Sequence, residues 1–118
     1  MRDQLAPNFY RDEFVCKCGC GFDDVDPRLV EALQALREAV GVPVMINSAC
    51  RCPAHNAAVG GSTKSQHLLG KAADIRTAEY TPGALRENVL EIPAFRDGGV
   101  GLYATFVHAD VRGYAARW

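Results

Sequence analysis

The sequence lacks the features that mark membrane proteins and nucleic-acid binders. Its longest apolar stretches are far shorter than the about 20 residues of a membrane-spanning helix. It has no basic run that would supply the electrostatic footprint of a nucleic-acid binder, and its formal net charge at pH 7 is only -1. We therefore expect no membrane insertion and no nucleic-acid partner.

The segment 1–7, MRDQLAP, lacks the apolar middle region of a secretory signal peptide. We therefore expect a protein that is cytoplasmic as synthesised. The sequence also contains no internal repeat and no low-complexity segment, and a length of 118 residues is typical of one domain. We expect a single domain over residues 1–118, and a monomer.

The five cysteines fall in two clusters, with Cys16, Cys18 and Cys20 in the first and Cys50 and Cys52 in the second. A bridge between residues two apart is strained, so a disulfide would join the first cluster to the second. The odd number leaves at least one thiol free. In a tetrathiolate zinc site, single residues would separate neighbouring cysteine ligands along the sequence, whereas two or more residues are typical. Three alternatives stay open: reduced thiols in packing positions, disulfides, and a second zinc site.

Apolar periodicity and turn residues predict an α+β domain in which helices pack on one side of a small antiparallel sheet. Residues 8–22 have turn chemistry and form a cysteine-bearing N-terminal arm in which Phe9 and Phe14 are buried. Helices are expected over 27–40 and 53–59, with a second long helix that starts at 81–82 and extends to about 92. Strands are expected over 44–48 and 72–76, followed by a hairpin of 99–103 and 106–111 that turns near 104–105.

Two histidines and one aspartate are the most informative residues. His67 and Asp74 lie in the segment SQHLLGKAADI, and His108 lies in FVHADVR. Three imidazole and carboxylate ligands without a fourth side chain are typical of catalytic zinc, because structural zinc sites close all four positions. Asp74 and His108 fall in predicted strands, so a rigid sheet would hold both. Side chains alternate along a strand, so Asp110 is expected on the same face as His108.

These residues and their flanking segments resemble the zinc D-Ala-D-Ala carboxypeptidase family. The resemblance is carried by NSACR at 47–51, HNAAVGG at 55–61, the Ser-x-His-x-x-Gly-x-Ala-x-Asp motif and the Val-His-x-Asp ending. The family includes vancomycin-resistance dipeptidases, phage L-alanyl-D-glutamate endolysins and the hedgehog signalling domain. This sequence is most similar to compact bacterial and phage members, from about Phe9 to Arg112.

The resemblance implies that the two histidines and the aspartate bind zinc in a cleft on the sheet, with water as the fourth ligand. It implies that Arg51 lies near the substrate carbonyl or carboxylate, where a guanidinium can stabilise a developing oxyanion. Ser65 and Gln66 are candidates for orienting the substrate or a zinc ligand. Tyr103 is a further substrate-binding candidate, with packing in the hairpin as the alternative.

The sequence departs from relatives at two positions near this site. Many relatives carry a tyrosine just before the arginine, where this sequence has Cys50. Several branches supply a glutamate or histidine base shortly before the late histidine, and the segment YATFV at 103–107 contains neither. Asp110 is the nearest carboxylate and therefore the candidate base. Its alternative role is structural, as the partner of Arg112 or Arg51.

The resemblance implies a zinc metallopeptidase that cleaves bacterial cell-wall (peptidoglycan) peptides at a bond involving a D-amino acid, as a carboxypeptidase or an endopeptidase. The alternative is a metal-binding phage structural, assembly or peptidoglycan-binding module that does not hydrolyse its ligand. A cytoplasmic enzyme would be separated from a cell-wall substrate. This conflict favours a phage-encoded endolysin that is released to the cell wall.

Overall fold

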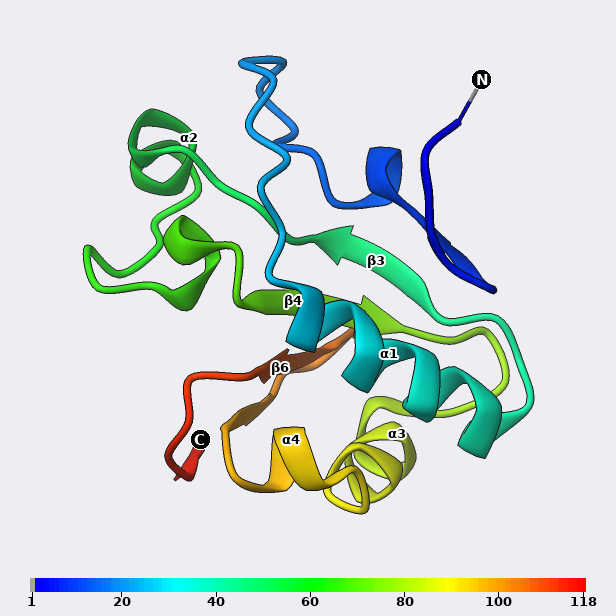
Figure 1. Cartoon of the computed structure of the whole chain (residues 1–118). Helices are drawn as coiled ribbons and strands as arrows, with labels where there is room; N and C mark the ends of the chain where they lie inside the picture. The colour runs from blue at the N-terminus through cyan, green and yellow to red at the C-terminus, as the bar shows by residue number, and fades with distance from the viewer. Residues whose placement is uncertain (1) are drawn as a thin grey trace.

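A five-stranded sheet organises the computed structural model, which describes residues 2–118 (Figure 1). Its strands, in spatial order, are β3 (Met45–Ser48), β4 (Ala72–Arg76), β6 (Val107–Asp110), β5 (Gly99–Leu102) and β7 (Ala116–Arg117). Neighbouring strands are antiparallel, except that β7 runs parallel to β5. A separate two-stranded sheet pairs β1 (Gln4–Ala6) with β2 (Phe9–Tyr10).

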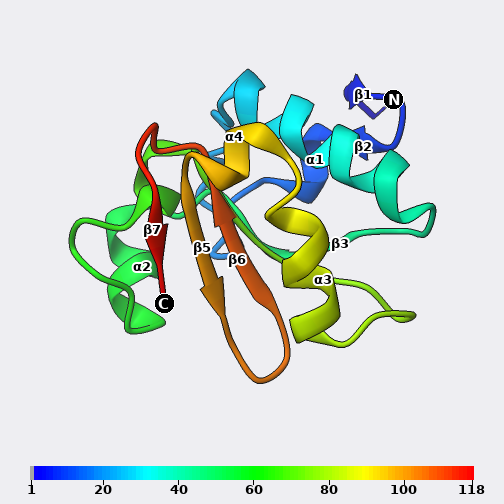
Figure 2. The same cartoon turned by 90° about the horizontal axis from the view of Figure 1, so that it is seen from below.

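Three helices lie together on one side of the large sheet (Figure 2). They are α1 (Pro27–Val40), α3 (Pro82–Val89) and α4 (Pro93–Arg96). Helices α3 and α4 contact β5 and β6, and α1 packs on both of these helices. The short helix α2 (Pro53–Ala58) lies apart from them, next to the 3-10 helix η2 (Gln66–Leu69). The expected α+β arrangement is confirmed. None of the helices in the described part of the chain combines the length and apolarity needed to cross a membrane.

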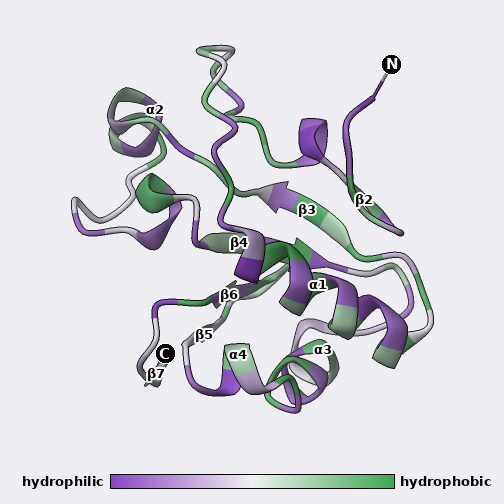
Figure 3. Ribbon diagram, viewed as in Figure 1, coloured by the Kyte–Doolittle hydropathy of each residue, from purple (hydrophilic) through white to green (hydrophobic). Residues whose placement is uncertain are grey.

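Helix α1 follows from the local sequence signals that predicted it. The Asp26 carboxylate accepts a hydrogen bond from the Arg28 amide at 2.9 Å, and Pro27 occupies the first helical position. Gly41 ends the helix in the left-handed conformation, with a φ of 69°. Hydrophilic and hydrophobic residues alternate along α1 (Figure 3), and Leu29 and Leu33 are fully buried in the core.

The second long helix is shorter than predicted, because α3 begins at Pro82 as expected but ends at Val89 and not near residue 92. The short helix α4, which begins at Pro93, was not predicted. Proline disfavours helical backbone at the residue before it, and Ile92 is extended, with φ -86° and ψ 116°. The arm is also more regular than expected, because it contains β2 and the 3-10 helix η1 (Arg11–Glu13). Its two phenylalanines are buried as predicted.

Candidate metal centre

The register of the sheet places four residues in one row across the strands. Ser48 pairs with Asp74, Asp74 pairs with His108, and His108 pairs with Gly101. Directly opposed residues on neighbouring strands have their Cβ atoms about 5 Å apart on one face, so their side chains meet. Strand pairing thus brings together Asp74 and His108 from distant parts of the sequence.

His67 reaches the same place from η2, which lies just before β4. The Ser65 hydroxyl accepts a hydrogen bond from the His67 amide at 3.2 Å and so caps the start of η2. Gly70 ends η2 with a φ of 68°, in the left-handed region that favours glycine. A Cβ at Gly70 would also clash with the backbone carbonyl of Asp24. The serine and glycine of the motif therefore fix the turn that carries the histidine.

The structure brings the three predicted metal ligands together. The Asp74 Oδ1 atom lies 3.2 Å from His67 Nε2 and 3.1 Å from His108 Nδ1. All three ligand atoms lie within 4.8 Å of one another, and all three residues are buried. A tetrahedral ion with ligand distances of about 2.1 Å requires separations of about 3.4 Å between ligand atoms. The observed spacing therefore fits a zinc ion.

The hydrogen bonds of both imidazoles leave the inner nitrogens free for a metal. His67 Nδ1 lies 2.6 Å from the Ala49 carbonyl oxygen, which can only accept, so this nitrogen carries the proton. His108 Nε2 donates in the same way to Asp110 Oδ2 at 2.8 Å. In neutral rings, His67 Nε2 and His108 Nδ1 then present lone pairs to Asp74. Three acceptors that converge in this way repel one another unless a proton or a cation lies between them, and a cation in that position is the arrangement of a metal site.

Arg51 holds the other side of the Asp74 carboxylate. Its Nη2 donates to Asp74 Oδ2 at 2.9 Å, which leaves Oδ1 for the metal position. Its Nε donates to Ser48 Oγ at 3.0 Å and its Nη1 to Asn56 Oδ1 at 3.3 Å. A Cβ at Gly61 would clash with the Asn56 amide, so this glycine leaves room for the network. Arg51 is thus a fixed group beside the metal centre.

The site keeps its two carboxyl groups ionised. Burial raises the pKa of Asp74, but hydrogen bonds with His108 and His67 outweigh it and hold that pKa well below its usual range. Burial likewise raises the pKa of Asp110, but hydrogen bonds with His108 and Arg112 hold it well below its usual range. Burial lowers the pKa of His108, but its hydrogen bonds to the two aspartates leave it raised.

Asp110 lies beneath His108, with 0% of its surface exposed. Its Oδ1 accepts from the Gly99 amide at 2.8 Å and from the Arg112 amide at 3.1 Å. Its Oδ2 accepts from His108 Nε2 and from Arg112 Nη2, both at 2.8 Å. A Cβ at Gly99 would clash with this carboxylate, so only glycine fits there. Asp110 and His108 share one face of the strand, as expected. Both oxygens of the Asp110 carboxylate already accept hydrogen bonds from the protein.

A cavity of about 650 Å³ opens over the metal ligands. The predicted residues Ser65, Gln66 and Tyr103 all contribute to its wall, as does Arg51. The remaining wall includes three aromatic residues, Phe106, Tyr114 and Trp118, of which Tyr114 and Trp118 were not expected from the sequence. A substrate that enters this cavity meets charged, polar and aromatic surfaces at once.

Trp118 forms part of the site although it lies outside every motif. It follows strand β7 directly, and the Leu102 amide donates to the Trp118 carbonyl oxygen at 2.9 Å. Its indole Nε1 donates to the Tyr103 hydroxyl at 2.8 Å, and its ring centre lies 4.9 Å from that of His108. Asn56 was also missed as a site residue. The sequence did contain an indication of its role, because Asn56 is part of the HNAAVGG segment.

Replacing Gly101 by alanine should displace Trp118 from the site. A Cβ at Gly101 would clash with the Trp118 ring, which is 46% exposed and can swing outward. Trp118 is the single tryptophan, so intrinsic fluorescence should shift to longer wavelength and become easier to quench. Gly83→Ala is the matched control, because a Cβ there meets nothing within 4 Å. Identical emission and quenching in Gly101→Ala and the wild type would contradict the placement of Trp118.

A buried His/Asp/His set with an arginine on its aspartate, placed under an open cavity, is an arrangement that can hold a metal ion and is typical of hydrolytic metal centres. The sequence matches the family described as Peptidase M15 over residues 7–110, nearly its whole length, and the chain belongs to this family. The family is one of zinc-dependent metallopeptidases, in agreement with the donor set seen here. No curated protein sequence matches the chain.

Proposed function

We propose that this protein is a zinc peptidase that cleaves peptidoglycan peptides at a bond involving a D-amino acid. The observation that carries the proposal is the convergence of His67 Nε2, Asp74 Oδ1 and His108 Nδ1 beside Arg51. When bound, zinc supplies Lewis acidity and lowers the pKa of a water ligand to about 7. The chain's residues contribute orientation, charge and substrate contacts.

Arg51 is the residue that we assign to the substrate's carbonyl or carboxylate oxygen. A guanidinium has five N–H donors, and Ser48, Asn56 and Asp74 accept three of them. The other two are available to a substrate, since Arg51 lines the cavity. Its side chain is only 13% exposed, so its charge acts in a partly desolvated place, where electrostatic stabilisation is strongest.

The charges around the cavity support a substrate that carries carboxylates. Arg51, Lys64 and Arg112 line it. Asp74 balances the charge of Arg51 and the buried Asp110 balances that of Arg112, so Lys64 leaves the wall with a net positive charge. Cell-wall stem peptides are short, carry free carboxylates and contain D-amino acids. The aromatic wall, with Tyr103 stacked on Phe106 at a ring distance of 4.4 Å, offers an apolar surface for small side chains such as alanine.

For Asp110 we propose a positioning role instead of the role of general base. Its carboxylate is fully buried and accepts hydrogen bonds from Gly99, His108 and Arg112, which leaves it no path to a substrate proton. The bond to His108 Nε2 instead fixes the ring and leaves Nδ1 unprotonated. A carboxylate behind a ligating histidine has this effect in many metal sites.

Incubating the zinc-loaded protein with purified peptidoglycan fragments should release peptide products that mass spectrometry detects. The masses distinguish loss of one terminal residue from internal cleavage, and so a carboxypeptidase from an endopeptidase. A peptide with L-alanine in place of D-alanine is the control for stereochemistry, and chelator-treated protein is the control for the metal. Absence of cleavage with zinc bound would instead support the non-hydrolytic binding or assembly module. We further propose that the protein is phage-encoded and is released to the cell wall.

A further inference from the structure

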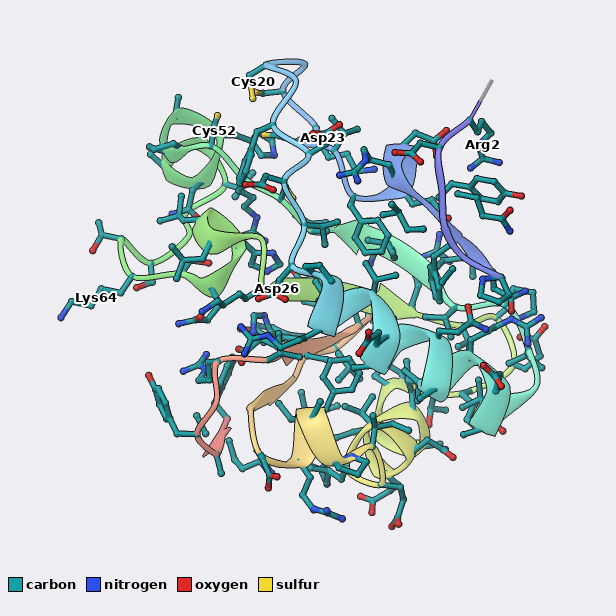
Figure 4. All side chains as sticks on the ribbon, viewed as in Figure 1. Arg2, Cys20, Asp23, Asp26, Cys52 and Lys64 are labelled. Atoms are coloured by element: carbon teal, nitrogen blue, oxygen red, sulfur yellow. The ribbon has the colours of Figure 1, made fainter. Side chains whose placement is uncertain are left out.

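A second cluster of potential metal ligands lies on the N-terminal arm. The sulfur atoms of Cys16, Cys18, Cys20 and Cys52 all lie within 4.8 Å of one another. Figure 4 shows Cys20 and Cys52 side by side, although they come from two segments of the chain that are distant in sequence. None of the four is a predicted ligand of the metal centre on the sheet.

We propose that these four cysteines hold a structural zinc ion. The Cys18 sulfur lies 3.5 Å from that of Cys16 and 3.6 Å from that of Cys52. A tetrahedral ion with zinc–sulfur distances of about 2.3 Å requires sulfur separations of about 3.8 Å. A disulfide would require about 2.05 Å. The thiols are thus spaced as the corners of a metal tetrahedron, and four protein ligands close a zinc site of the structural type.

The backbone of the arm accounts for the unusually short ligand spacing. Gly19 stands between Cys18 and Cys20 and has a φ of 85°, a left-handed conformation that side chains rarely adopt. The Gly19 amide donates to the Cys16 carbonyl at 3.3 Å, and the Cys16 amide donates to the Phe22 carbonyl at 2.8 Å. These bonds close a tight loop, so three cysteines separated by single residues point to one place.

Backbone amides also point at the sulfur atoms. The Cys52 amide donates to Cys16 Sγ and the His55 amide donates to Cys52 Sγ, each at 3.4 Å. Hydrogen bonds to an ionised acceptor are stronger than those to a neutral one, so these donors favour the thiolates that a metal requires.

The consequence of this site would be to fasten the arm to the segment that carries Arg51. Cys52 follows Arg51 directly, and the amide of Cys50, which precedes Arg51, donates to the Phe14 carbonyl of the arm at 3.0 Å. A metal that binds the folded site and not the unfolded chain contributes directly to folding free energy. The zinc would therefore hold the backbone from which Arg51 reaches the metal centre on the sheet.

The test is the zinc content of the purified full-length protein, measured by mass spectrometry of the metal. We expect two zinc ions in each wild-type chain. Cys20→Ser should lower this number to one, and so should His67→Ala, which removes a ligand of the other site. Cys20 is exposed, so its replacement leaves the core intact. Cys50→Ala is the matched control, because Cys50 is a core residue outside the cluster, and it should retain two zinc ions.

X-ray absorption at the zinc edge of the wild-type protein tests the same proposal without any variant. It should show sulfur ligands at about 2.3 Å in addition to nitrogen or oxygen ligands at about 2.0–2.1 Å. A spectrum without sulfur ligands would overturn the proposal. So would an intact mass lowered by the hydrogens lost in a disulfide, or equal zinc loss in Cys20→Ser and Cys50→Ala. Failure of peptide cleavage would leave the sulfur signal unchanged, so the two proposals fail separately.

Discussion

Replacing His67 by alanine should remove the metal of the sheet site and the peptidase activity together. His67 Nε2 is one of three converging donors, and two remaining ligands hold zinc much more weakly than three. Without zinc, the pKa of water is no longer lowered toward neutrality, so hydroxide would not be available as a nucleophile at neutral pH. We expect cleavage to fall to the level of chelator-treated protein, measured on the same peptidoglycan fragments.

His55→Ala is the matched control for this experiment. His55 lies in α2, outside the metal-ligand cluster, and its backbone amide contacts Cys52. We expect His55→Ala to retain zinc and cleave at the wild-type rate. Full zinc content and normal cleavage in His67→Ala would show that the His/Asp/His site is not the catalytic centre. Circular dichroism would establish that both variants are folded.

The elements that the sequence predicted well are those with strong local signals. Helix α1 has an aspartate cap, a proline at its first position, a regular apolar stripe and a terminal glycine, and each acts within a few residues. Strand β4 is buried from Ala72 to Ile75, and its observed bounds, Ala72–Arg76, are those predicted. The clustering of His67, Asp74 and His108 could be predicted because a metal site restricts residue types as well as spacing.

The features that were missed depend on contacts between distant segments. Strand β7 has only two residues, too few for any periodicity, and it exists because it pairs with β5. Trp118 enters the site through that pairing alone. The Ala49 carbonyl fixes the His67 tautomer through its backbone oxygen, which leaves no trace in residue type. Helix α4 has a local signal in Pro93, which disfavours helical backbone at Ile92 and suits a first helical position, but its four residues are too few for an apolar periodicity.

Replacing Asp110 by asparagine should weaken zinc binding by changing the tautomer of His108. Two backbone amides, of Gly99 and Arg112, donate to Oδ1, so the asparagine oxygen should take that position. Its NH₂ group then faces His108 Nε2, where the aspartate accepted a hydrogen bond. The ring must move its proton to Nδ1, the atom that faces the metal position. We expect zinc affinity to fall by about 10–100-fold, as for other residues that orient a ligand.

A zinc titration separates this positioning role from that of a general base. If Asp110 positions His108, excess zinc should restore most of the activity of Asp110→Asn. If Asp110 were the base, zinc affinity would be unchanged and the rate at saturating zinc would fall by about 10²–10⁴-fold. Nitrogen NMR of the histidine ring reports the tautomer directly. Asp97→Asn is the control, because Asp97 is an exposed carboxylate after α4 and should change neither quantity. Full burial keeps the Asp110 carboxylate in contact with His108 and out of the cavity, so we expect the result of a positioning residue.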